Sequence, residues 1–193
     1  MTLPVIYLLG DSISAGYAPG VATALAGLAV VRLRPDNGKD SRNLLARAPE
    51  WLGAERYAAI HVNCGLHEIK RPKLAPELPI SLDEYEANLR RLIPMLRRSA
   101  PVVVWARTTP VIDNVVTRKS FARFSRDVDD YNVVADRVMA DLGVPINDLN
   151  GAILNAGADL CLSPDGVHMT EFGYSILAGR VADALRPCLR GPN

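Results

Sequence analysis

The hydrophobic pattern alternates short apolar runs with longer stretches of helical periodicity along the whole chain. Residues 4–9 read Pro-Val-Ile-Tyr-Leu-Leu and stop at Gly10, which is typical of a strand buried on both faces. Similar runs predict further strands at about 29–33, 57–63 and 101–106, and a short one at 144–146. The stretches between and after them predict helices at about 19–27, 41–52, 81–98, 125–142 and from 170 to just before Pro187.

A strand followed by a helix, repeated along the chain, is the pattern of a parallel sheet, because parallel neighbours need crossover connections. We therefore expect an α/β fold, a three-layer α/β/α sandwich around a central parallel sheet of about five strands. A chain of 193 residues suits a single domain spanning residues 1–193. Ligands of such folds bind at the carboxyl ends of the strands, so we expect the loops at 10–16, 35–41, 64–73, 107–121 and 163–168 to converge.

The composition narrows the class of protein. Lys and Arg number 22 against 21 for Asp and Glu, so no net charge favours nucleic acid or an anionic membrane. The longest apolar stretch, residues 21–31, is far shorter than the roughly 20 residues of a membrane-spanning helix. Without a leader-peptide pattern, and if no leader has been removed, we expect a cytoplasmic protein. Cys64, Cys161 and Cys188 are too scattered for a disulfide framework, so we expect reduced thiols.

A serine lies just past the first predicted strand. The segment reads Gly10-Asp11-Ser12-Ile13 and continues to Gly16. Flanking glycines let the backbone turn tightly, which holds Ser12 at the mouth of the sheet, where a nucleophile would lie. The alternative is an ordinary strand-to-helix turn in which Asp11 or Ser12 caps backbone amides.

A second chemical element, Asp165-Gly166-Val167-His168, precedes the last predicted helix. Residues three apart in a helical turn share one side, so Asp165 can hold Nδ1 of His168 while Nε2 points outward as a base. The alternative is a helix-entry turn with a surface histidine. Because both elements fall where loops should converge, the joint pattern favours catalysis.

Through these two elements the chain resembles the SGNH hydrolases, also called the GDSL esterase/lipase family. The resemblance covers the whole chain and implies a flavodoxin-like α/β/α fold with a triad in the order Ser, Asp, His. It further implies that Ser12 is the nucleophile, that His168 is the general acid and base, and that Asp165 orients His168. No cofactor is implied.

The resemblance also implies an oxyanion hole formed by the Ser12 amide, the Gly38 amide and a third donor. The family has Gly-x-Asn-Asp after its third strand, whereas this chain has Gly65-Leu66-His67-Glu68. His67 therefore stands at the asparagine position. An imidazole can also donate an N–H, although its donation depends on tautomer and protonation.

Other residue types offer weaker alternatives. Cys64 near His67 could be a thiol nucleophile, but a cysteine at a strand end is more often a small buried hydrophobe. His61 alternates within a strand, which favours a packed histidine. Because His61, His67 and Glu68 lack metal-ligand spacing, we predict no metal.

Charged side chains in the predicted active-face loops are candidates for substrate contact. We assign this role to Asp11 and Arg107, and consider it for Lys70, Arg71 and Lys73. The commoner alternative for such loop charges is solvation at the surface.

The predicted function is that of a serine esterase acting on short-chain acyl esters, such as O-acetyl groups on carbohydrate or similar polar substrates. Alternatives are a thioesterase or lysophospholipase, an acyltransferase, and a non-catalytic carbohydrate-binding relative. Nucleotide binding is disfavoured, because the first loop lacks both Gly-x-Gly-x-x-Gly and a phosphate loop. We expect a small-molecule or carbohydrate ester as partner, with neither nucleic acid nor membrane; oligomeric state is left open.

Overall fold

A parallel five-stranded sheet forms the centre of the protein in a computed structural model that describes residues 2–72, 77–113 and 121–189. The strand order is β2-β1-β3-β5-β7, and every neighbouring pair is parallel. The strands are β1 (Val5–Leu9), β2 (Val30–Leu33), β3 (Ala59–Val62), β5 (Val102–Ala106) and β7 (Ile146–Asn147). The predicted fold class is confirmed.

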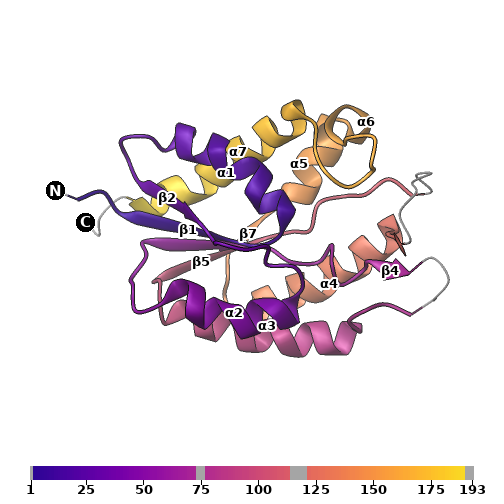
Figure 1. Ribbon diagram of the computed structural model, residues 1–193, viewed down its shortest axis with the longest axis horizontal. Helices are drawn as coiled ribbons and strands as arrows, with labels where there is room; N and C mark the ends of the chain where they lie inside the picture. Colours follow the sequence, from indigo (N-terminus) through magenta and orange to yellow (C-terminus); the bar gives the residue numbers. More distant parts are fainter. Residues whose placement is uncertain (1, 73–76, 114–120, 190–193) are drawn as a thin grey trace.

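Helices cover both faces of this sheet, as Figure 1 shows. One face carries α1 (Ser12–Ala24), α5 (Leu149–Ala156), α6 (Ala158–Cys161) and α7 (Glu171–Leu185), which continues into a 3₁₀ turn at Arg186–Leu189. The other face carries α2 (Ser41–Leu52), α3 (Leu82–Arg97) and α4 (Ser125–Asp141). A separate two-stranded antiparallel ribbon pairs β4 (Arg71–Pro72) with β6 (Phe121–Ala122).

The central strands lie between the two helical layers, and their apolar sequences follow from that position. Ile6, Leu8, Ile60 and Trp105 are fully buried. The edge strand β2 is mostly exposed instead. This difference explains why the central strands are near-continuous apolar runs.

The first helix starts earlier than its pattern predicted. We expected a helix at about 19–27, whereas α1 begins at Ser12 and contains Pro19. The Asp11 side chain accepts the Ile13 amide and so caps the helix at the end of β1. The short elements α5, α6, β4 and β6 were not predicted at all. No helix within the described residues is long and apolar enough to span a membrane.

Candidate active site

Ser12, His168 and Asp165 form one hydrogen-bonded chain. The Ser12 hydroxyl oxygen lies 2.9 Å from Nε2 of His168, although 156 residues separate them in sequence. On the other side of the ring, Nδ1 lies 2.7 Å from a carboxylate oxygen of Asp165. With the proton on Nδ1, Nε2 accepts the serine hydroxyl, which is the tautomer that a general base requires. This arrangement can move the serine proton to the imidazole.

The Asp165 carboxylate is held by its own turn. One oxygen accepts the amides of Val167 and His168 and the hydroxyl of Ser163, each at 2.9 Å. Partial burial raises the pKa of Asp165, but hydrogen bonds from the His168 ring, from both amides and from Ser163 outweigh it. The net pKa of Asp165 lies well below its usual range. The carboxylate therefore stays ionised and fixes the orientation of the ring.

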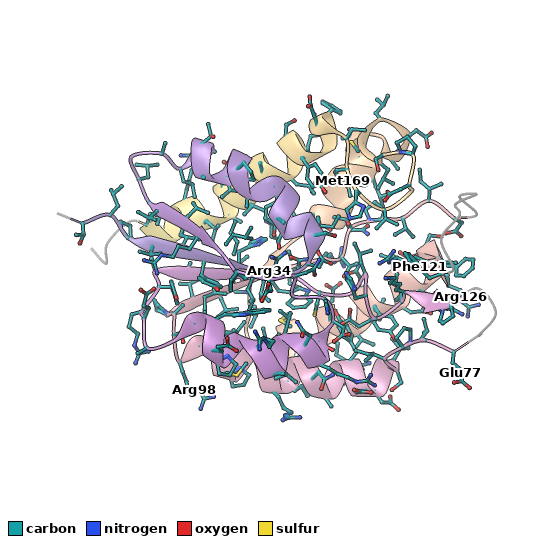
Figure 2. The ribbon with its side chains drawn as sticks, viewed as in Figure 1. Arg34, Glu77, Arg98, Phe121, Arg126 and Met169 are labelled. Atoms are coloured by element: carbon teal, nitrogen blue, oxygen red, sulfur yellow. The ribbon has the colours of Figure 1, made fainter. Side chains whose placement is uncertain are left out.

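The turn that carries Ser12 is fixed from two sides. In front, the Asp11 side chain caps α1, whose first residue is Ser12. Behind it, the buried guanidinium of Arg34 donates to the carbonyl oxygens of Gly10 and Asp11. Figure 2 shows Arg34 near the centre of the molecule. This contact was not predicted from the sequence, because an arginine after an edge strand is usually solvated.

Asn63, just after β3, ties the third strand to the same turn. Its side-chain amide donates to the Asp11 carboxylate at 3.0 Å. A side chain at Gly10 would collide with the Asn63 side-chain oxygen, so the close approach of the two segments requires glycine there. Sequence reasoning had not singled out Asn63.

The loop after β2 also meets this turn. The Gly38 amide donates to the Gly10 carbonyl at 2.8 Å. The predicted donation from Gly38 to an oxyanion would require this bond to open. Gly38 also allows the two segments to pack closely, because a Cβ there would collide with the same carbonyl.

The loop after β5 reaches the turn that holds His168. The Ile112 amide donates to the Gly166 carbonyl at 2.9 Å, and the Thr108 hydroxyl donates to the Cys64 carbonyl at 3.1 Å. The described parts of the predicted loops therefore do converge. Lys73 and residues 114–120 of two of these loops lie outside the described residues.

His67 lies within electrostatic range of Asp11, the residue before Ser12. Its ring has no hydrogen-bond partner among the described residues. Burial lowers the pKa of His67, and the charges of Arg123 and Lys70 lower it further, although Asp11 and Asp40 oppose them. The ring is thus kept neutral with one N–H to donate.

The geometry disfavours Cys64 as a nucleophile and offers little support for a metal site formed by His61, His67 and Glu68. The Cys64 side chain is buried, and burial together with the charge of Glu68 raises the pKa of its thiol, which disfavours a nucleophilic thiolate. His61 is fully buried between the Tyr17 hydroxyl at 3.2 Å and the Asn147 side-chain amide at 3.1 Å. Within the described ranges, no three His, Cys, Asp or Glu side chains form a metal-binding group.

Two residues predicted to contact substrate, Asp11 and Arg107, also have partners within the protein. Asp11 is 1% exposed and is used as a helix cap and as the acceptor of Asn63. Arg107 forms a bidentate pair with Asp136 and a second ion pair with Asp148 at 3.4 Å. Both residues therefore have structural partners that account for their positions.

The site and the fold together are typical of one class of enzyme. A Ser–His–Asp chain at the mouth of an α/β/α sandwich is the arrangement used by serine hydrolases. A model of the GDSL-like lipase/acylhydrolase family matches residues 8–176, and the chain belongs to this family. The resemblance inferred from the sequence is thus confirmed.

Solved structures share the fold at low sequence identity. The lipase/acylhydrolase from Enterococcus faecalis superposes with a TM-score of 0.82 at 20% identity, covering 99% of this chain and 100% of the other. The acetylxylan esterase Axe2 from Geobacillus stearothermophilus gives 0.72 at 21% identity, covering 100% and 96%. LAE5, an α/β hydrolase from the Lake Arreo metagenome, gives 0.77 at 17% identity, covering 99% of each chain. A comparison with curated protein sequences gave no match.

Proposed function

We propose that this protein is a serine esterase that cleaves short-chain carboxylic esters through an acyl-enzyme on Ser12. The observation that carries the proposal is the 2.9 Å contact between the Ser12 hydroxyl and Nε2 of His168, with Asp165 at 2.7 Å behind the ring. A serine hydroxyl is a poor nucleophile until a base removes its proton, and His168 is the base within reach.

The reaction proceeds in two halves. His168 takes the Ser12 proton as the hydroxyl attacks the ester carbonyl, and then gives that proton to the leaving alcohol. In the second half His168 takes a proton from water, the water attacks the acyl carbonyl, and Ser12 leaves with the proton restored. Asp165 stabilises the imidazolium that forms in each half.

The oxyanion of each tetrahedral intermediate needs aimed donors. Ser12 is the first residue of α1, so its amide lies among those that have no partner within the helix. We assign the oxyanion hole to this amide and to the neutral His67 ring. Gly38 joins them only if its amide releases the Gly10 carbonyl.

The substrate class we propose is a polar ester with a short acyl group, such as an O-acetylated carbohydrate. Support comes from the family, whose model describes lipases and acylhydrolases, and from the likeness in fold to an acetylxylan esterase. The competing assignments from the sequence are a thioesterase or lysophospholipase, an acyltransferase and a non-catalytic binder.

Labelling with a fluorophosphonate tests the nucleophile. We expect the native protein to be labelled once, and Ser12→Ala to lose both the label and all ester hydrolysis. Ser175→Ala is the matched control, because Ser175 is exposed on α7. Hydrolysis that survives in Ser12→Ala would overturn the proposal.

Chain-length dependence tests the substrate. We expect acetyl and propionyl 4-nitrophenyl esters to exceed octanoyl esters in kcat/KM, and acetate to be released from acetylated xylo-oligosaccharides. A preference for long acyl chains or for acyl thioesters would move the assignment to the lysophospholipase or thioesterase alternatives.

A further inference from the structure

Arg123 brings a positive charge to the active site that sequence analysis did not single out. It lies between β6 and α4, and its Nε donates to the carbonyl oxygen of Leu66 at 2.5 Å. Leu66 directly precedes His67, so this bond anchors the guanidinium beside the proposed oxyanion donor. The Phe121 ring, 5.4 Å from the guanidinium carbon, supports it from another side. Figure 2 shows Phe121 at the end of the molecule toward which the parallel strands point.

The electrostatic neighbours of Arg123 belong to the catalytic site. Its charge interacts with the carboxylates of Asp11 and Asp165 and with the His67 ring. Burial lowers the pKa of Arg123, and the two carboxylates oppose that shift. A half-buried guanidinium therefore stands within electrostatic range of Asp11 and of Asp165.

The carboxylates of Asp11 and Asp165 do not need Arg123 as a hydrogen-bond donor. Asp165 already accepts two amides, the Ser163 hydroxyl and the His168 ring, and Asp11 accepts Ile13 and Asn63. Within the described part of the chain, Arg123 forms no salt bridge, and its terminal nitrogens have no hydrogen-bond partner.

Other arginines of the same region behave differently. Arg107 pairs with Asp136, and Arg71 pairs with Asp127. The Arg123 guanidinium is half-buried and anchored at Leu66, and its terminal nitrogens have no acceptor among the described residues, so it is suited to a ligand that supplies the acceptors. A planar guanidinium fork matches a carboxylate in particular.

We propose that Arg123 anchors a carboxylate of the substrate, so that the enzyme prefers esters that carry a carboxylate near the scissile bond. This inference rests on the proposed esterase function and specifies its substrate. Arg123 then acts as a specificity residue, while the proton transfers remain with Ser12 and His168.

Matched ester pairs test the preference. On the leaving-group side the pair is 3-acetoxybenzoate and its neutral amide, 3-acetoxybenzamide. On the acyl side it is mono-4-nitrophenyl succinate and 4-nitrophenyl butanoate. We expect kcat/KM to favour the charged member of at least one pair by about 10- to 100-fold, the range of a charge-assisted hydrogen-bonded contact.

Variants of Arg123 locate the source of that preference. Arg123→Gln is expected to reduce the charged-to-neutral ratio at least about 10-fold, and Arg123→Lys to retain part of it. Arg126→Gln is the matched control, because that arginine is exposed on α4 with a long contact of 3.9 Å to Asp130. Thermal melts of each variant show whether it is folded. Equal losses on both members of each pair would indicate a merely structural role and overturn the proposal, as would an unchanged ratio.

A binding measurement separates this inference from the esterase assignment. In the Ser12→Ala background, calorimetry compares 3-acetoxybenzoate with 3-acetoxybenzamide, with and without Arg123→Gln. We expect the charged ligand to bind more tightly and to lose about 10-fold or more in affinity when Arg123 is replaced. Absence of ester hydrolysis and of fluorophosphonate labelling in the native protein would refute the esterase alone, whereas equal affinities here would refute the carboxylate subsite.

Discussion

Replacing Glu68 by glutamine removes an ionisable group from the middle of the protein. Glu68 is fully buried, and one of its oxygens accepts the Ser41 amide at the start of α2 at 2.6 Å. The other oxygen is buried without a hydrogen-bond partner among the described residues. Glutamine preserves the shape and the acceptor but has no charge, so the substitution isolates the cost of ionisation.

That cost can be worked from the pKa. Burial raises the pKa of Glu68 from 4.5 to about 7, against hydrogen bonds that lower it. Because the folded-state pKa is the higher one, the folded protein binds more protons, and Glu68 destabilises it as pH rises from 4.5 to 7. The difference of about 2.5 units corresponds to about 3 kcal/mol.

Urea unfolding of both proteins at several pH values measures this effect. Relative to wild type, Glu68→Gln should gain about 3 kcal/mol in unfolding free energy between pH 4.5 and pH 8. Burial lowers the pKa of His61 to about 3. This shift makes the free energy of unfolding rise with pH over part of the same range, so only the difference between the two proteins isolates the effect of Glu68. The exposed Glu77→Gln serves as control. Parallel pH profiles for wild type and Glu68→Gln would refute the reasoning.

Three further substitutions test the site and its support. Asp165→Asn should lower kcat roughly 1000- to 10,000-fold with little change in the melting temperature, because the charge that orients His168 is lost; near-normal steady-state kinetics would contradict this. Gly10→Ala should destabilise the protein by about 1–3 kcal/mol through collision with Asn63, which denaturant unfolding would detect and an unchanged midpoint would disprove. Arg34→Ala should lower the free energy of unfolding by about 2–4 kcal/mol in the same assay, because the carbonyls of Gly10 and Asp11 lose charged donors; a loss below about 1 kcal/mol would show that these hydrogen bonds contribute little.

Local signals in the sequence were sufficient for the main elements of the fold. Apolar runs such as 4–9 and 101–106 predicted strands because strands buried on both faces need continuous apolar sequence. The helix α1 begins earlier than the predicted 19–27, because the Asp11 side chain caps it at Ser12 and Pro19 lies inside it. The short β4–β6 ribbon was missed, since two-residue strands have no period to detect.

Some features of the candidate site could be predicted from short motifs, and others depended on the tertiary structure. Ser12 and the pair of Asp165 and His168 are marked by motifs a few residues long, and the fold brings them into one hydrogen-bonded chain. The role predicted for Gly38 depended on where an amide points, which spacing cannot tell. The structure directs that amide to Gly10.

The sequence by itself determined the alternation of strands and helices, the parallel sheet and the two motifs at its mouth, because each is encoded in residues close together along the chain. Tertiary structure alone decided which charges have partners. Arg107 is neutralised by Asp136, Arg34 holds the carbonyls behind Ser12, and Arg123 reaches the site with its terminal nitrogens unpaired among the described residues. A long charged side chain pairs with whichever group lies near it in space, and the folded chain brings such groups together only when segments distant in sequence pack.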